Sequence, residues 1–287
     1  KIYENININE LQLLGKGTQG SVYKIDDKKC IKYLDNPTAD FIVILGDSVA
    51  GGNNSNALLS QLNDFRNIVA SYYETKPLIP VLGNHEVNIN PTDDTFEKLF
   101  SKCYADLNVT DYLDEYNKTV YYIDFDNYRL IFLNSFHYNE IHKITNNQLK
   151  WFENICKQSN KNKLLFLHSP AFPTGAHLGH CLDLYPKCRD DFWSIVDKYE
   201  IKLVFSSHEH NYSRRVVSGK NDIYQIISGG AGEKLRNKYN SKNGVIIPPI
   251  AVYHFVVMDL LPNTIEVSAI DLKGKILDEF IIHLNDN

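Results

Sequence analysis

The apolar positions along the chain follow two different patterns after Pro37. Four short runs are almost entirely apolar, which is typical of strands buried on both faces of a sheet. These runs are Phe41–Leu45, Leu78–Leu82, Lys163–Leu167 and Ile201–Phe205. Other segments repeat apolar residues at three- and four-residue spacing, as on one face of a helix. These are Asn56–Tyr73, Thr95–Cys103, Asn146–Gln158 and Asp190–Tyr199. Strands that alternate with helices predict parallel β–α–β units.

Two further pairs of segments predict antiparallel β-hairpins, because each pair is separated by a short stretch of turn residues. The pairs are Val120–Phe125 with Arg129–Leu133, and Val252–Met258 with Thr264–Asp271. Parallel units and hairpins together predict the α/β class, as a sandwich of mixed sheets flanked by helices.

Residues 1–36 differ from the rest of the chain. Leu11–Lys24 and Lys29–Tyr33 predict short β segments around the turn residues 26–28. We therefore expect two units, an N-terminal β-hairpin fragment over residues 1–36 and an α/β domain over residues 37–287.

Composition and charge narrow the class of protein. The chain has 287 residues, of which 43% are hydrophobic and 23% charged, as in globular proteins. The apolar runs are far shorter than the roughly 18 residues of a membrane span, so none is expected. The formal charge of −5 and the lack of a basic block argue against nucleic-acid binding.

Polar side chains follow each of the four buried runs. Ligands of open α/β sheets bind outside the carboxyl ends of the strands, so we expect these side chains to share one crevice. They are Asp47, Asn84, His85, Glu86, His168, His208 and His210. Any one such histidine is more often an ordinary core or surface residue, but four clusters at four strand ends favour a site. Asp, Asn and His donors together suit Fe, Mn or Zn.

These clusters resemble the motifs of calcineurin-like metallophosphoesterases, with local similarity to the purple acid phosphatase branch. The family pattern is DxH, GD, GNH[DE], H and GHxH, and this chain has Gly46-Asp47, Gly83-Asn-His-Glu86, His168 and Ser207-His-Glu-His210. The resemblance extends over residues 37–287. It implies an α/β/β/α sandwich and a metal-dependent phosphoesterase, most simply a phosphomonoesterase that uses metal-bound water as its nucleophile.

The resemblance also implies a role for each matched residue. Asp47 would bridge two metals, Asn84, His168 and His208 would complete one metal site, and His210 would belong to the other. His85 would donate a proton to the leaving oxygen, oriented by Glu86. His137 stands where some purple acid phosphatases carry a substrate-contacting histidine.

Three other residues could serve the same site. Arg214, just after the HxH cluster, could bind a phosphate through paired hydrogen bonds. His177 and His180 follow the His168 strand and could line an entrance, but we expect a solvated loop there. His142 is given no role.

One motif of the family is missing. No histidine precedes His85, so DxH is absent and the chain is expected to hold either one or two metal ions. Ala50 stands where purple acid phosphatases have a tyrosine ligand, so no iron–tyrosinate is expected.

The expected partner is a phosphorylated small molecule or phosphoprotein. The alternative is a non-catalytic phosphate-binding or interaction module on the same fold.

A second resemblance stands where DxH would lie. Gly15–Val22 fits the glycine loop GxGxxGxV of protein kinases, and Lys29–Lys32 fits the strand that carries their ATP-contacting lysine. HRD and DFG sequences are absent, so no kinase activity is expected. The segment is interpreted as a kinase remnant, as a junction, or as a hairpin whose glycines serve only turns.

Overall fold

The computed structural model describes residues 12–17, 20–26, 29–33, 39–52, 54–73, 76–88 and 91–284. Its helices are α1 (Ser55–Tyr73), α2 (Thr95–Cys103), α3 (Asn146–Lys157) and α4 (Pro186–Lys198), with short 3₁₀ turns η2 (His85–Val87), η3 (Asp114–Tyr116) and η4 (Leu182–Leu184). Its strands are β1 (Gln12–Gly17), β2 (Gly20–Asp26), β3 (Lys29–Tyr33), β4 (Ile42–Ile44), β5 (Leu78–Pro80), β6 (Asp111–Tyr112), β7 (Tyr121–Phe125), β8 (Tyr128–Phe132), β9 (Asn162–Phe166), β10 (Leu203–Ser206), β11 (Tyr212–Ser218), β12 (Asp222–Ser228), β13 (Val245–Ile250), β14 (His254–Leu260), β15 (Thr264–Asp271) and β16 (Ile276–His283).

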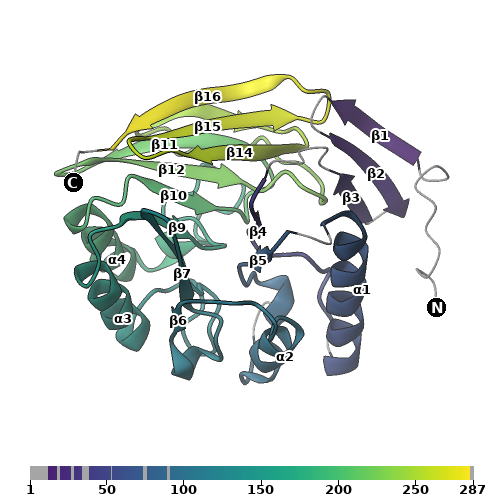
Figure 1. The fold of residues 1–287 in the computed structure, drawn as a ribbon, viewed down its shortest axis with the longest axis horizontal. Coiled ribbons are helices and arrows are strands. Elements are labelled where there is room, and N and C mark those ends of the chain that lie inside the picture. Colours follow the sequence, from purple (N-terminus) through teal and green to yellow (C-terminus); the bar gives the residue numbers. More distant parts are fainter. Residues whose placement is uncertain are drawn as a thin grey trace.

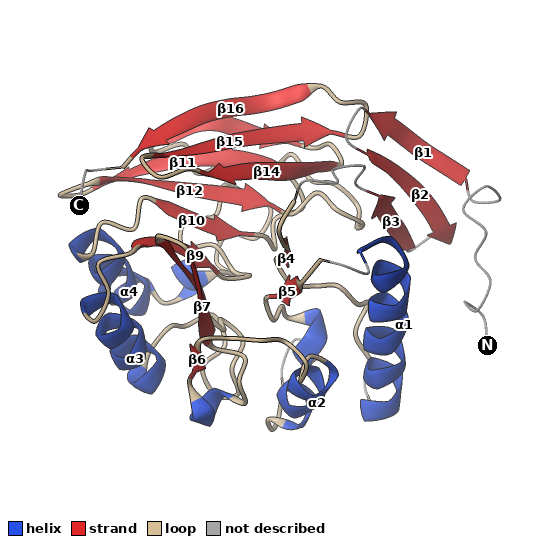
Figure 2. Ribbon diagram, viewed as in Figure 1, coloured by secondary structure: helices blue, strands red, loops and turns tan. Residues whose placement is uncertain are grey.

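The large sheet is mixed. Its eight strands run in the order β13-β11-β12-β10-β9-β8-β7-β6. The four central strands β12, β10, β9 and β8 are mutually parallel, and the hairpins β7–β8 and β11–β12 add antiparallel partners. A second sheet, β14-β15-β16, lies over it, as Figures 1 and 2 show.

Alternating residues of the central strands enter two different cores. Leu164 and Phe166 of β9 pack with Val267 of β15, whereas Leu165 between them packs with Phe152 of α3. All of these side chains are fully or almost fully buried. The large sheet is therefore covered by helices α3 and α4 on one face and by the small sheet on the other (Figure 2).

Strands β4 and β5 form a separate parallel pair, with α1 and α2 packed together beside them. Val81 N donates to the Ile44 carbonyl at 2.8 Å and so extends this pair by one residue. Pro80 has no N–H to donate to a ladder, which limits further pairing of β5. The pair still delivers the loops after Ile44 and Pro80 to the carboxyl ends of the large sheet.

The predicted fold class is confirmed, with helices and sheets where the apolar pattern indicated them. Helix α2 has the predicted bounds, whereas α4 begins at Pro186 instead of Asp190, because proline favours the first turn of a helix. The N-terminal segment forms an antiparallel sheet, β1-β2-β3. Part of the glycine loop, residues 18–19, lies outside the described residues.

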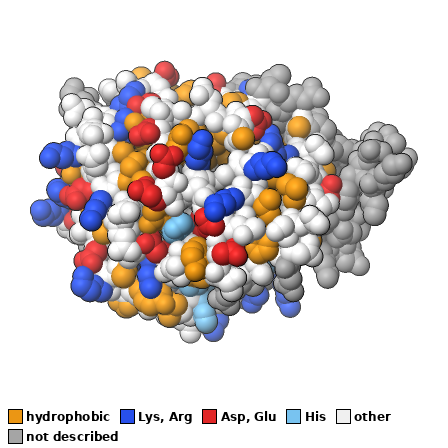
Figure 3. Space-filling view, turned by 90° about the horizontal axis from the view of Figure 1, so that it is seen from below, with side chains coloured by type: hydrophobic (Ala, Val, Ile, Leu, Met, Phe, Trp, Pro, Cys, Tyr) orange, Lys and Arg blue, Asp and Glu red, His pale blue; other side chains and the backbone are white. Residues whose placement is uncertain are grey.

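The surface seen from below the view of Figure 1 mixes charges of both signs. Figure 3 shows acidic and basic side chains interspersed with apolar ones over this face. In the part of the chain that the structure describes, no helix has both the length and the apolar character that a membrane span requires.

Candidate metal centre

The loop after β4 carries Asp47 in an unusual backbone conformation. Gly46 has a φ of 85° and Asp47 a φ of 55°, the left-handed region that non-glycine residues seldom adopt. A Cβ on Gly46 would lie 2.5 Å from His168 Nδ1, so only glycine permits this close approach. The turn brings the Asp47 carboxylate beside the loops that follow β5 and β9.

The Glu86 carboxylate holds two of these loops together. It accepts hydrogen bonds from Asp47 N at 2.9 Å, from Ser48 N at 2.7 Å and Ser48 Oγ at 2.8 Å, and from Gly83 N at 2.8 Å. Burial, and then the nearby Asp47 carboxylate, raise the pKa of Glu86. Glu86 therefore positions the Asp47 loop against the Asn84 loop.

Four side chains meet at the ends of β4, β5, β9 and β10. His168 Nε2 lies 3.0 Å from Asp47 Oδ2, 3.1 Å from Asn84 Oδ1 and 3.2 Å from His208 Nδ1. Asp47, His168 and His208 each offer a ligand atom, and these atoms all lie within 4.8 Å of one another. The sequence-predicted Asp47, Asn84, His168 and His208 therefore share one centre.

The outer hydrogen bonds of the two histidines indicate which ring nitrogens face the centre with a lone pair. His168 Nδ1 lies 2.6 Å from the Leu45 carbonyl and His208 Nε2 lies 3.2 Å from the His180 carbonyl. A carbonyl can only accept, so these outer nitrogens carry the protons. In the neutral rings, His168 Nε2 and His208 Nδ1 are then free to bind a cation, as is usual for metal-ligating histidines.

The charges of the centre also suit a cation. Burial opposes ionisation of Asp47, but His168 and His85 hold the pKa of its carboxyl well below the ordinary value. Burial lowers the pKa of His168, but Asp47 outweighs it and the net shift is upward. The pKa of His208 falls well below its ordinary value because the ring is buried beside other histidines. An anionic carboxylate, an amide oxygen and imidazoles form a donor set that suits Fe, Mn or Zn.

His85 lies beside the centre and remains partly exposed. Its Nδ1 lies 2.9 Å from the Ala50 carbonyl, to which it donates, and its Nε2 lies 4.0 Å from Asp47 Oδ2. The side chain is 34% exposed, so a ligand can reach it. We expected Glu86 to orient this ring, but the hydrogen bonds of Glu86 go to backbone and Ser48 donors, and Ala50 orients His85 instead.

The Glu209 carboxylate connects the loop after β10 to residues 174–177. His208 has a φ of 63°, so the backbone turns sharply there. The buried Glu209 carboxylate accepts hydrogen bonds from Thr174 N at 2.5 Å, Gly175 N at 2.8 Å and His177 N at 2.9 Å. Residues 174–177 are thereby held against the HxH loop. The sequence analysis assigned no role to Glu209.

Two histidines outside the predicted set of metal ligands lie next to His208. The ring centroids of His177 and His142 are 4.4 Å and 6.1 Å from that of His208. Burial lowers the pKa of each to about 4. The segment around His177 was expected to be a solvated loop, and no sequence signal marks His142, because only the folded chain brings the two rings to His208.

The ligands of a second metal site are not brought together in the described residues. His210 Nδ1 lies 3.0 Å from the Lys234 carbonyl and donates to it, while its ring lies 5.7 Å from that of His177. His210 is not part of the group of converging ligand atoms. Asp40, which precedes Asp47 in the chain, is exposed and is also not part of that group.

Two predicted substrate-binding residues have other partners. Arg214 pairs with Asp278, with Nε–Oδ2 at 2.6 Å and Nη2–Oδ1 at 3.0 Å, and its guanidinium lies over Phe280. Asp278 thus engages the guanidinium that the sequence analysis assigned to phosphate, because β11 turns this side chain toward the small sheet. His137 Nδ1 lies 2.9 Å from Glu97 Oε2 and the ring stacks at 4.0 Å on Tyr116.

Solved structures with the same fold include a purple acid phosphatase. The chain is similar to the purple acid phosphatase PPD1 from seeds of yellow lupin (Lupinus luteus), with a TM-score of 0.69 and 17% identity, over 86% of this chain and 47% of the lupin chain. PhoD gives a TM-score of 0.62 and 11% identity, over 86% of this chain and 64% of that chain. GAP50, the anchor in the inner membrane complex of Plasmodium, gives a TM-score of 0.58 and 16% identity, over 86% of this chain and 79% of that chain. These likenesses show a shared fold.

No curated protein matches the chain. A model of the calcineurin-like phosphoesterase family matches residues 22–212. The match begins inside the segment that resembles a kinase glycine loop, and that kinase resemblance is not supported by the matches. The boundary between residues 36 and 37 stays a prediction. The family match covers more than half of the chain and includes Asp47, Asn84, His168 and His208, so the chain belongs to the calcineurin-like phosphoesterase family.

Proposed function

We propose that the protein is a metal-dependent phosphomonoesterase whose substrate is a phosphorylated small molecule or phosphoprotein. Asp47, Asn84, His168 and His208 would hold one ion of Fe, Mn or Zn. The observation that supports this most strongly is the convergence of the Asp47, His168 and His208 donor atoms within 4.8 Å, with the Asn84 oxygen beside them. The purple acid phosphatase from lupin shares the fold but is about twice as long, so the reaction and substrate are proposals for this chain.

The bound metal would supply Lewis-acid polarisation of the phosphoryl group and lower the pKa of water. The residues of the chain would supply the proton for the leaving group. His85 donates its Nδ1 proton to the Ala50 carbonyl, which leaves Nε2 on the exposed side near Asp47. Protonated at Nε2, His85 would act as a general acid and transfer that proton to the leaving alkoxide.

A second cationic group of the chain lies at the same edge. Arg236 N donates to the His210 carbonyl at 2.9 Å, and the Arg236 charge contributes, after burial, to the lowered pKa of both His177 and His210. The side chain is exposed, and its guanidinium has no hydrogen bond or ion pair within the described part of the chain. We assign it the phosphate contact that the sequence analysis gave to Arg214.

Metal content and hydrolysis test this function together. Purified protein should carry close to one equivalent of Fe, Mn or Zn and should hydrolyse an aryl phosphate. His208→Ala should lose most of the metal, with activity reduced at least 100-fold, because it removes a ligand. The matched control is His283→Ala, since His283 is an exposed residue on β16 remote in sequence from the centre.

Two results would contradict the proposal. Wild-type protein without bound metal after reconstitution would exclude the assigned centre. Protein that binds one metal and inorganic phosphate, but turns over no phosphomonoester, would instead indicate a non-catalytic phosphate-binding module.

A further inference from the structure

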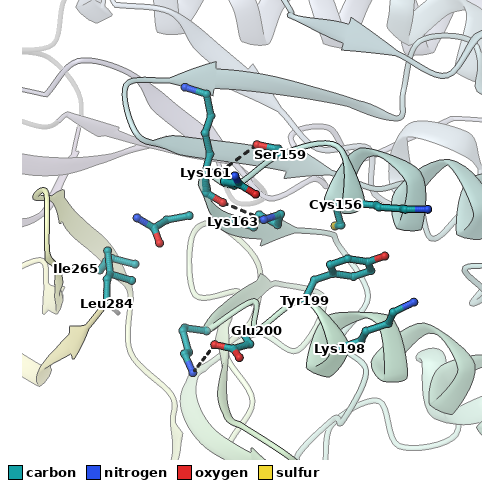
Figure 4. Close-up of a pocket in the computed structure, with 13 residues that line it drawn as sticks. Cys156, Ser159, Lys161, Lys163, Lys198, Tyr199, Glu200, Ile265 and Leu284 are labelled. Carbon is teal, nitrogen blue, oxygen red and sulfur yellow. Dashed lines mark hydrogen bonds and ion pairs between the residues drawn. The ribbon is translucent and has the colours of Figure 1, made fainter. Parts of the chain in front are cut away.

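A hollow of about 550 Å³ opens at the amino ends of β9 and β10 (Figure 4). Its walls come from the last residues of α3 and α4, the turn between α3 and β9, Ile265 of β15, and Leu284 just after β16. Its volume is within the range of roughly 300–1,000 Å³ that is usual for small-molecule sites.

This hollow is separate from the candidate metal centre. His168 follows the carboxyl end of β9, whereas Lys163 lies at its amino end. A strand rises by about 3.3 Å per residue, so five residues place the two about 16 Å apart. A ligand in the hollow would therefore not be the substrate of the metal centre.

The lining of the hollow is strongly basic. Five lysines and one carboxylate, that of Glu200, line it, and we call it the lysine pocket. The lysines are Lys157, Lys161, Lys163, Lys198 and Lys202. This excess of positive charge is unusual in a chain whose formal net charge is −5.

Two of these lysines have an acidic partner within the described residues. Lys198 Nζ lies 2.6 Å from Glu153 Oε1, and Lys202 Nζ lies 3.8 Å from Glu200 Oε2. The other three contact no carboxylate among residues 39–284 that the structure describes. Positive charges on three lining residues without a carboxylate partner repel one another unless an anion neutralises them.

For two of the three lysines without a carboxylate partner in the described residues, no helix end explains the positive charge. Lys157 ends α3, where a positive charge interacts favourably with the helix dipole. Lys161 and Lys163 lie outside the helix. In the part of the chain that the structure describes, Lys161 donates to the Asp126 carbonyl and Lys163 to the Lys161 carbonyl. Burial, with a contribution from Arg129, lowers the pKa of Lys163, so its charge is costly without a counter-ion.

We propose that the lysine pocket binds a small molecule or ion that carries a chain of two or more phosphate groups. Such an anion would contact Lys161 and Lys163, and its several charges would match the several unpaired ammonium groups. Asn162 offers amide donors in the same wall. Tyr199 offers an aromatic ring, and Figure 4 shows it with Lys161 and Lys163.

Isothermal titration of the full chain with tripolyphosphate tests the proposal. Wild-type protein should bind at about 0.15 M salt, and the Lys161→Met/Lys163→Met variant should bind at least tenfold more weakly. Methionine keeps the apolar stem and removes the ammonium group. The matched control is Lys273→Met/Lys275→Met, which removes the same charge at the opposite end of the small sheet and should stay within twofold of wild type.

Further arms separate the pocket from the metal centre. Asp47→Ala should keep its affinity for tripolyphosphate, because the proposed pocket does not use that residue. ATP should bind at least tenfold more tightly than AMP, since the proposal requires more than one phosphate. If the double variant does not fold, Lys157→Met, at an exposed position, should still weaken binding severalfold. Equal losses in the pocket and control variants, no binding by wild type, or equal affinities for AMP and ATP would overturn the proposal.

Discussion

Asp47 and His208 both adopt positive φ angles, 55° and 63°, and both are proposed metal ligands. Such conformations cost roughly 1–3 kcal/mol each for non-glycine residues and persist only where the surroundings hold them. A buried carboxylate holds the backbone near each of these residues through hydrogen bonds. Glu86 accepts from the Asp47 amide, and Glu209 follows His208 and holds the 174–177 loop.

Gly83 is the residue at which this arrangement can be tested without changing a ligand. A Cβ at this position would lie 2.4 Å from Asp47 Oδ1 and 2.9 Å from Glu86 Oε2. Gly83→Ala should therefore weaken metal binding by about 10- to 100-fold, as changes to the residues around metal ligands commonly do. The metal affinity would be measured from the unfolding temperature at increasing metal concentrations.

Gly232→Ala is the control for Gly83→Ala. No atom lies within 4 Å of a Cβ at Gly232 among the described residues, so metal affinity and unfolding temperature should match wild type. Unchanged metal affinity in Gly83→Ala would show that Asp47 is not held in the way described.

Arg236 gives a prediction about substrate binding. Arg236→Met should raise KM for an aryl phosphate about tenfold and change kcat less, because an exposed charged contact acts mainly on binding. Arg236→Lys should recover part of the loss, since charge is kept while the paired geometry is lost. Lys238→Met, a nearby exposed change, should leave KM unchanged; equal effects of the two variants would remove the role assigned to Arg236.

At the scale of elements, β11 shows why part of the sheet was not predicted. Its residues Ser213, Arg214 and Arg215 are polar, yet all three are buried. The hydrophobic pattern therefore indicated no strand there. Arg214 is accommodated because Asp278 of β16 pairs with it through two hydrogen bonds. The partner lies 64 residues away in the chain, so local patterns cannot reveal it.

This ion pair joins the large sheet to the small one. Asp278→Ala leaves the buried Arg214 charge without its partner and should reduce the free energy of unfolding by about 3–5 kcal/mol. Urea unfolding would measure the loss. The neighbouring, exposed Glu279→Ala should stay within about 0.5 kcal/mol of wild type. A similar small effect for Asp278→Ala would mean that the pair does not stabilise the sandwich.

At the scale of the whole molecule, the candidate centre depends on loops from different parts of the chain. Asn84 follows β5 of the small parallel pair, whereas His168 follows β9 of the large sheet. The carbonyl of Leu45 contacts His168 Nδ1 and so links the two sheets directly at the centre. The fold thus brings both sets of strand ends to the same side of the molecule (Figure 1).

The sequence by itself determined the α/β class, most helices and central strands, and that Asp47, Asn84, His168 and His208 lie together at one sheet edge. These follow from local periodicity and from the polar residues that end each strand, and both are properties of neighbouring residues. The tertiary structure decided the partners of Arg214, Glu86 and His177. Each is set by contacts between segments distant in the chain, and such contacts depend on which face of an element is buried and against what.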